Sequence, residues 1–320
     1  MASAITGDLR SLGEEHLIPL IRAWLGAASP PSPHGIGDDC AVLPAPRARV
    51  RRLITVDPVI QGRHFDESLP PARVAEKLLK RNLSDIAAMG GTPRHAVVAL
   101  AAPPSLRVSW LRDFFRALGR AARRHGVAIV GGDCAQTTGF LGIWLTLLGD
   151  APRRPLTRKG ARCGDLIFVT GTLGGSILGR HVRFTPRLEE GRWLAARNDV
   201  RSAIDVSDGL AKDVRALLPA GTGAVLDPRN LPVSAAARRL ARSTGRPALE
   251  HACNDGEDYE LLFTIAPVRA AAFVIAWHRR FTTPISCIGK LERRASRDPA
   301  IRLAPAPATS VRLRGYEHFR

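Results

Sequence analysis

The chain has 320 residues, of which 45% are hydrophobic, and a formal net charge of +18 from 47 Lys and Arg against 29 Asp and Glu. This length and apolar content are enough for the cores of two ordinary domains. No apolar run reaches the roughly 18 residues of a membrane span, and the first residues lack a signal-peptide pattern. We therefore expect a soluble, cytoplasmic protein that does not enter a membrane.

The positive charge makes nucleic-acid binding one interpretation, because clustered Lys and Arg neutralise phosphates. Here the basic residues are almost all arginines spread over most of the expected helices, with no basic tail and no aromatic-interleaved stripe. Specific nucleic-acid binding is therefore not favoured. The five cysteines are odd in number and contain no C-x-x-C pair, which favours free thiols over a zinc site or a disulfide framework.

Along the first half of the chain, an amphipathic helix is expected near residues 8–27, followed by the Pro-rich stretch SPPSPHG and the acidic pair Asp38 and Asp39. Apolar runs at 53–56 and 95–102 indicate strands on either side of a helix at 71–89. A further helix runs from Trp110 to about Ala122, and Gly126 is well placed to end it.

Strands are expected next at 127–130 and 143–148, before the polar, Pro-containing connection DAPRRPLTRKGARCGD. Such a connection is typical of a linker, so we place a domain boundary near residue 150. The second half begins with the strand LIFVTG and continues to a Pro-rich tail after Leu291. The alternation of strands and helices indicates two α/β or α+β domains.

Carboxylates recur beside small residues and at the ends of apolar runs. A single aspartate in this setting is more often a helix cap or a turn former. Gathering many of them against their mutual repulsion favours a doubly charged cation, and hard oxygen ligands suit Mg²⁺, which usually accompanies a phosphate substrate. The residues in this pattern are Asp38, Asp39, Asp57, Asp85, Asp133, Asp205, Asp208, Glu257 and Asp258.

Two further features are compatible with a phosphate ligand. If Ser207 or Asp208 starts a helix that runs through Leu210, the N-terminus of that helix can hold a phosphate. Glycine-rich turns at 131–132 and 171–175 follow apolar runs and let the backbone approach a phosphate closely. Neither turn matches a P-loop or a dinucleotide-binding motif, and the chain has no covalent hydrolase signature.

The order of the motifs resembles the thiamine-monophosphate kinase family, which shares a superfamily with the aminoimidazole ribonucleotide and selenophosphate synthetases. The resemblance covers nearly the whole chain. The motifs that carry it are GIGDDCAVL, ITVD with GRHF, NLSDIAAMGG, GGD, LTRKGARCGDLIFVTGTLG, AIDVSDGLAKD, GEDYELLFT and GYEHF.

The resemblance implies an α/β (α+β) fold of two domains. Residues 1–150 would bind ATP and Mg²⁺ and carry a mixed sheet that pairs with a second subunit into a dimeric barrel. Residues 151–320 would form a sandwich-like α/β domain that completes the nucleotide and substrate site, with ATP between the domains. The implied protein is a homodimeric enzyme.

The implied reaction is direct transfer of the ATP γ-phosphoryl group to thiamine monophosphate, with several Mg²⁺ ions and no covalent catalytic residue. Three groups of residues are carried over by position. Mg²⁺ would be bound by Asp39, Thr55, Asp57, Asp85, Asp133, Asp205 and Asp208. ATP would contact Gly132, Asp133, Arg158 and Ser207. Thiamine monophosphate would face His64, Glu257 and Tyr316.

The chain departs from the family pattern at three places near the expected site. Val56 and Pro58 flank Asp57 where threonines are common, and Cys134 stands where GGD is usually followed by threonine. The segment 176–187 is shorter than usual, and its Phe184 stands where proline is common. Two alternatives therefore stay open: a related ATP-dependent enzyme with a different acceptor, and a non-catalytic nucleotide-binding paralogue.

Overall fold

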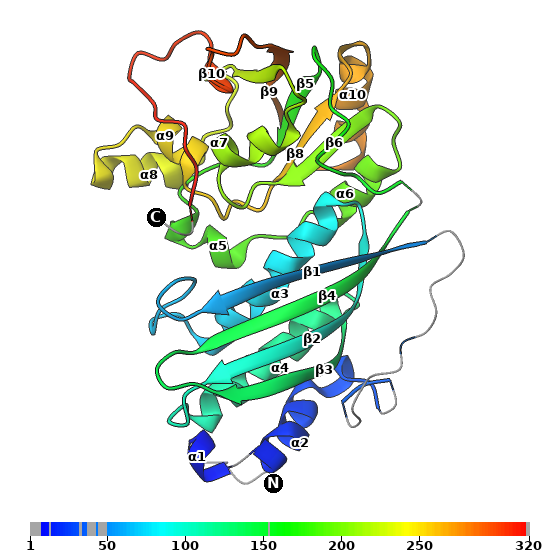
Figure 1. The fold of residues 1–320 in the computed structure, drawn as a ribbon, viewed down its shortest axis with the longest axis vertical. Coiled ribbons are helices and arrows are strands. Elements are labelled where there is room, and N and C mark those ends of the chain that lie inside the picture. The colour runs from blue at the N-terminus through cyan, green and yellow to red at the C-terminus, as the bar shows by residue number, and fades with distance from the viewer. Residues whose placement is uncertain are drawn as a thin grey trace. The chain divides into compact units, whose positions relative to one another are not determined.

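The computed structural model describes residues 8–12, 14–31, 34–36, 43, 50–152 and 154–317. The chain divides into two compact units, drawn in Figure 1. The first comprises residues 1–86 and 92–151, and the second comprises residues 87–91 and 152–320. The fold is mixed α/β with one sheet in each unit.

The sheet of the first unit has four strands in the order β1-β4-β2-β3. Strands β2 and β3 are parallel and the other pairs are antiparallel, so the sheet is mixed, as the resemblance implied. Strands β1, β2 and β4 contain the apolar runs that predicted them and extend beyond them, whereas β3 begins at Ala128, one residue after the start of the run predicted at 127–130. Their bounds are β1 (Arg51–Ile60), β2 (Thr92–Ala102), β3 (Ala128–Gln136) and β4 (Gly142–Ala151).

Pro58 lies inside β1, opposite Trp144 of β4. Proline has no N–H to donate and is tolerated in a sheet mainly on an edge strand. Because β1 is at the edge of the sheet, the proline at this position disturbs the hydrogen bonding between strands little. The departure from the family pattern is therefore compatible with a ten-residue strand.

Two long helices, α3 (Pro71–Ala88) and α4 (Val108–Arg124), lie on one side of this sheet (Figure 1). Their buried residues recur at helical spacing, as in Leu111, Phe114 and Leu118 of α4. Gly126 follows the end of α4 with a φ of 67°, which confirms the predicted stop. Where one helix was expected, the chain forms α1 (Leu9–Leu12), α2 (Glu14–Leu25) and the 3₁₀ turn η1 (Gly26–Ala28).

The sheet of the second unit has six strands in the order β10-β7-β9-β5-β8-β6. Strand β10 pairs in parallel with β7, and the other pairs are antiparallel. The bounds are β5 (Leu166–Thr170), β6 (Val200–Asp205), β7 (Thr222–Leu226), β8 (Leu261–Ile265), β9 (Ile285–Arg293) and β10 (Ile301–Leu303).

Both faces of this sheet are covered at β8, because every residue of this interior strand is buried. Leu262 belongs to a core that includes residues of α7 (Leu210–Asp213) and α9 (Ala248–Asn254). Its neighbour Phe263 points the other way and contacts Phe273 and Trp277 of α10 (Ala270–Arg280). Alternation along one strand thus separates an aliphatic core from an aromatic one.

The remaining helical segments of the second unit are short. Those that matter for the site are η2 (Ser176–Leu178), α5 (Arg180–Arg183) and α6 (Leu188–Ala195). The others are η3 (Val214–Leu217), α8 (Ala235–Thr244) and η4 (Pro267–Arg269). Within the described ranges, no helix combines the length and the apolar character that crossing a membrane requires.

Candidate active site

In the first unit, three of the residues predicted to bind Mg²⁺ lie together between β1 and α3. Thr55 and Asp57 are two apart on β1 and therefore point to the same face of the strand. The Thr55 hydroxyl donates a hydrogen bond to Oδ2 of Asp85 on α3. This cluster presents hydroxyl and carboxylate oxygens, which are the donors that a hard divalent cation prefers.

Arg81 is a fourth member of this cluster that the sequence did not point out. Its Nη2 lies 3.2 Å from Oδ1 of Asp57, and its Nη1 donates to the carbonyl oxygen of Pro58 at 3.0 Å. The sequence spacing could have identified Arg81, because it is four residues before Asp85 and so lies on the same face of the helix. Its positive charge offsets the repulsion between the two carboxylates.

Gly132 and Asp133 lie on β3, at the opposite edge of the sheet from β1. Three strand spacings separate the two edges, about 14 Å, so Asp133 is not part of the Thr55, Asp57 and Asp85 cluster. A Cβ on Gly132 would come 2.1 Å from the carbonyl oxygen of Val98. The backbone packing of the strand therefore requires glycine at this position.

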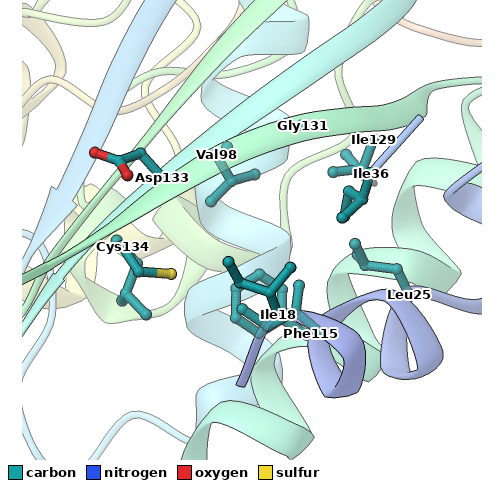
Figure 2. Close-up of a pocket in the computed structure, with 12 residues that line it drawn as sticks. Ile18, Leu25, Ile36, Val98, Phe115, Ile129, Gly131, Asp133 and Cys134 are labelled. Atoms are coloured by element: carbon teal, nitrogen blue, oxygen red, sulfur yellow. The ribbon is translucent and has the colours of Figure 1, made fainter. Parts of the chain in front are cut away.

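An apolar pocket of about 80 Å³ borders the same stretch of β3 (Figure 2). Ile18 of α2, Phe115 of α4 and Val98 of β2 contribute to its lining. Figure 2 shows Cys134 and Asp133 on opposite sides of the strand, as expected for consecutive residues. The aliphatic and aromatic walls suit an apolar group and offer little to a phosphate.

His64 lies just after β1, in a turn that its own side chain stabilises. The backbone N–H of Ile60 donates to His64 Nδ1 at 3.1 Å. Since Nδ1 accepts this bond, the ring proton of the neutral imidazole is on Nε2. The buried Lys77 donates to the His64 carbonyl oxygen at 2.9 Å. The donor group of the neutral His64 ring is therefore Nε2–H.

In the second unit, β6 ends at the buried Asp205 and leads into a turn that carries Ser207 and Asp208. The prediction that Ser207 or Asp208 starts a helix is wrong, because α7 begins at Leu210. Gly209 has a φ of 97°, which a right-handed helix does not allow. Since α7 is only four residues long, it provides no helix N-terminus for a phosphate.

Asp208 is held by contacts on its backbone and its side chain. Its carboxylate lies 2.8 Å from Lys212 Nζ, and its carbonyl oxygen accepts a hydrogen bond from the N–H of Tyr316 at 2.8 Å. Lys212 also donates to the Tyr316 carbonyl oxygen at 2.9 Å. The contact with Asp208 raises the pKa of the Lys212 amine. These bonds hold the segment around Tyr316 against the turn.

A second missed residue, Asp213, lies beneath the same turn. Its Oδ2 accepts a hydrogen bond from the N–H of Asp208 at 3.0 Å. Burial, and then the nearby Asp208 carboxylate, raise the pKa of Asp213 to about 7. Near neutral pH this side chain therefore exists in both protonation states.

Glu257 lies beside the turn, because its N–H donates to the Ser207 carbonyl oxygen at 2.7 Å. The Tyr259 hydroxyl donates to Glu257 Oε1 at 3.3 Å, and His181 Nδ1 lies 3.6 Å from Oε2. The sequence did not single out His181, which is 76 residues away and has no local signal. The fold thus brings Ser207, Asp208, Glu257 and Tyr316 together.

Arg158 is exposed on the segment that precedes β5. The carbonyl oxygen of its neighbour Thr157 accepts a hydrogen bond from the N–H of Ala203 at 2.9 Å. This bond places the segment beside β6, two residues before Asp205. An exposed guanidinium next to a carboxylate turn is suited to a phosphate group.

The structure leaves Mg²⁺ ligation a prediction. Over the part of the chain that is described, no group of three or more His, Cys, Asp or Glu side chains is arranged to hold a metal ion. Asp39, the predicted ligand of the GDD motif, lies outside the described residues. What the structure contributes is the pairing of Thr55 with Asp85 and the bonded environment of Asp208.

Comparisons with known proteins agree with the motif order. The family model AIR synthase related protein, N-terminal domain, matches residues 37–150. A thiamine-monophosphate kinase from Rhodopirellula baltica is 41% identical over 265 residues, which cover 80% of this chain and 83% of the relative. The chain spans most of the length of this relative.

Solved structures give the same result. The crystal structure of thiamine-monophosphate kinase from Stenotrophomonas maltophilia K279a aligns with a TM-score of 0.75 and 31% identity, over 91% of this chain and 96% of that one. A structure of AaThiL complexed with AMPPCP and TMP aligns with a TM-score of 0.72 and 29% identity, over 99% of this chain and 100% of that one.

Proposed function

Because this chain belongs to the thiamine-monophosphate kinase family, we propose that its carboxylates bind the Mg²⁺ ions that accompany ATP in the reaction. The activity itself follows from the family: the chain is a kinase that uses ATP to phosphorylate thiamine monophosphate. The observation that carries this conclusion is 41% identity to a thiamine-monophosphate kinase over 80% of the chain.

The proposed metal ligands have the donor chemistry of a Mg²⁺ site, since all of them are carboxylate or hydroxyl oxygens. Asp57 and Asp208 already lie within ion-pair distance of a cation, Arg81 at 3.2 Å and Lys212 at 2.8 Å. When bound, Mg²⁺ neutralises phosphate oxygens and reduces the repulsion between donor and acceptor. The proposed ligands are Asp39, Thr55, Asp57, Asp85, Asp133, Asp205 and Asp208.

ATP is proposed to contact Gly132, Asp133, Arg158 and Ser207. Gly132 lies on β3 at the edge of the sheet, next to Asp133. Arg158 presents an exposed guanidinium, which can bond two phosphate oxygens at once. Ser207 is partly exposed in the turn after β6, where its hydroxyl is able to donate to a phosphate oxygen.

Thiamine monophosphate is proposed to face His64, Glu257 and Tyr316. Thiamine carries a permanent positive charge on its thiazolium ring, and the Glu257 carboxylate complements that charge. In the neutral ring of His64 the N–H group is at Nε2, because Nδ1 accepts a backbone bond, and an N–H group is the kind of donor that a phosphate oxygen accepts from. Tyr316 is 41% exposed and is held beside Asp208 by its own N–H group.

The reaction needs no general base. The acceptor atom is an oxygen of a phosphate that is already ionised near neutral pH, so little proton removal is required before attack. The residues of the chain therefore act by positioning and by charge, with in-line transfer of the γ-phosphoryl group. This explains why the site is rich in carboxylates.

We also propose that the first unit binds ATP and Mg²⁺ and forms a homodimer through its sheet. Strand β1 is a ten-residue edge strand, and the unpaired N–H and C=O groups of such an edge can pair with a strand of another chain. Ile54 and Val56, on the outer face of β1, are 73% and 56% exposed. The second unit is proposed to complete the nucleotide and substrate site.

The proposal is tested by incubating the purified protein with ATP, Mg²⁺ and thiamine monophosphate and separating the products by chromatography. Thiamine diphosphate and ADP are expected in equal amounts. Reactions without Mg²⁺ or without the acceptor serve as controls. Formation of ADP and inorganic phosphate with no thiamine diphosphate at any Mg²⁺ concentration would mean that ATP is hydrolysed and that thiamine monophosphate is not the acceptor.

A further inference from the structure

The connection between β5 and α6, residues 171–187, contacts each of the six residues from Asp255 to Glu260. Its first half binds through the backbone and one hydroxyl. These three hydrogen bonds run from Gly174 N to Asp258 Oδ1 (2.9 Å), from Gly175 N to Asp255 Oδ2 (2.8 Å) and from Ser176 Oγ to the Gly256 carbonyl oxygen (2.6 Å).

The second half of the connection contacts three of these six residues, Glu257, Tyr259 and Glu260, through side chains. The ring of Phe184 stacks on the ring of Tyr259, with centroids 4.0 Å apart and an angle of 18° between the planes. Arg180 and Arg187 both donate to the buried Glu260. The segment that is short by comparison with the family is therefore bonded closely to the GEDYEL motif.

The bonded motif has a strained backbone. Glu257 and Tyr259 have φ values of 54° and 52°, in a region that costs a residue other than glycine roughly 1 kcal/mol or more. Such a conformation persists only where the surroundings impose it. On one side, the N–H groups of Glu257 and Tyr259 bond to the carbonyl oxygens of Ser207 and Val206, at 2.7 and 2.8 Å. The connection 171–187 holds the other side.

The two Glu257 oxygens have different partners in this arrangement. Oε1 accepts from the Tyr259 hydroxyl, whose ring is stacked by Phe184. Oε2 lies 3.6 Å from Nδ1 of His181. Phe184 and Tyr259 are 5% and 3% exposed, so their rings are too buried to contact a ligand face to face. They can act on a ligand only through Glu257.

We propose that His181 and Phe184 are positioning residues that orient the Glu257 carboxylate toward thiamine monophosphate. This inference rests on the proposed role of Glu257 in binding the acceptor. The two residues determine the affinity for the acceptor and leave the affinity for ATP unchanged. A carboxylate whose two oxygens are held in place loses less conformational entropy when it meets the thiazolium charge.

The test compares Michaelis constants for both substrates in Phe184→Leu and His181→Gln, with Glu257→Gln as the reference. Phe273→Leu is the matched control, because it removes another buried aromatic ring, which packs against Phe263 of β8. We expect Phe184→Leu and His181→Gln to raise the KM for thiamine monophosphate about threefold to tenfold. The KM for ATP is expected to stay within about twofold, and Phe273→Leu is expected to lower the melting temperature without moving either KM.

The other outcomes distinguish an error in the positioning role from an error in the proposed role of Glu257. If Glu257→Gln raises the KM for thiamine monophosphate while His181→Gln and Phe184→Leu do not, the positioning role is wrong and the proposed acceptor site stands. Equal increases in both KM values in Phe184→Leu would make its role merely structural and overturn the inference. If Glu257→Gln itself leaves the KM for thiamine monophosphate unchanged, the role of Glu257 is wrong and the positioning role falls with it.

Discussion

Arg187 holds the Glu260 carboxylate with two N–H groups, Nε at 2.7 Å from Oε2 and Nη2 at 2.8 Å from Oε1. Glu260 is fully buried, and Arg180 and the Thr170 hydroxyl donate to it as well. A buried carboxylate is tolerated only where charge and hydrogen bonds compensate its lost hydration. This cluster fixes the connection 171–187 to β8.

Replacing Glu260 is expected to destabilise the protein more than replacing Arg187. Glu260→Gln leaves two partly buried guanidinium groups facing a neutral amide and is expected to cost about 3–5 kcal/mol in the free energy of unfolding. Arg187→Met leaves Glu260 with Arg180 and is expected to cost less. Urea unfolding measures both values. The exposed pair of Arg229 and Asp227 provides a control, since Asp227→Asn should hardly move the unfolding midpoint. Equal losses of unfolding free energy in Glu260→Gln and Arg187→Met would contradict this account.

Asp213 is expected to make stability depend on pH. Its folded-state pKa of about 7 is above its ordinary value of 3.8, so folding favours the protonated form. The stabilisation from that form is fully present below about pH 4 and is lost as the pH rises through about 7. Asp213→Asn removes the titration. The free energy of unfolding of the variant, relative to that of the wild type, should therefore increase by on the order of 3 kcal/mol as the pH rises from 4.5 to 8.

Urea unfolding at several pH values, with a chelator present to exclude metal ions, measures this difference. Asp113→Asn is the control, because Asp113 is an exposed carboxylate on α4, and its stability curve should run parallel to that of the wild type. A constant offset between Asp213→Asn and the wild type across the pH range would mean that Asp213 is ionised throughout.

Asp85 is expected to be essential for turnover and dispensable for folding. Asp85→Asn keeps the size of the side chain and an oxygen for the Thr55 hydroxyl, but it removes the charge that a Mg²⁺ ligand needs. We expect the rate to fall roughly 100-fold or more, with circular dichroism unchanged. Thr55→Val should lower the rate less than Asp85→Asn does, and it should raise the Mg²⁺ concentration needed for half-maximal rate. Thr55→Ser keeps the hydroxyl and should return both quantities to their wild-type values. Near-normal turnover in Asp85→Asn would remove Asp85 from the metal site.

Local patterns predicted the elements well and the contacts between them poorly. Helices α3 and α4 were found because their apolar residues recur every three to four positions, and Gly126 marked the end of α4. The start of α7 was wrong because Gly209 has a φ of 97° and lies where a Cβ would come 2.9 Å from the backbone of Asn254. Helix propensity does not report such a contact.

In the site, too, local features were predicted and long-range contacts were not. The types of residue in the motifs predicted a metal and phosphate chemistry, since carboxylates at strand ends have a local signature. Pairings across long sequence separations have none: Thr55 meets Asp85 across 30 residues and His181 meets Glu257 across 76. Such pairs depend on how a connection folds back on its sheet. For this reason His181 and Phe184 acquire a role only in the structure.

The edge strand β1 is expected to carry the homodimer contact. Ile54 is 73% exposed on the outer face of this strand. A lysine at this position would place a charge in the contact with any sheet that pairs with this one. Ile54→Lys should therefore convert a dimer to a monomer in analytical ultracentrifugation, since an interface tolerates a buried, unpaired charge poorly. Val268→Lys is the matched control, because Val268 is 89% exposed in the second unit. A dimer that persists in Ile54→Lys at low micromolar concentration would place the contact elsewhere, and a monomeric wild type would remove the dimeric barrel from the proposal.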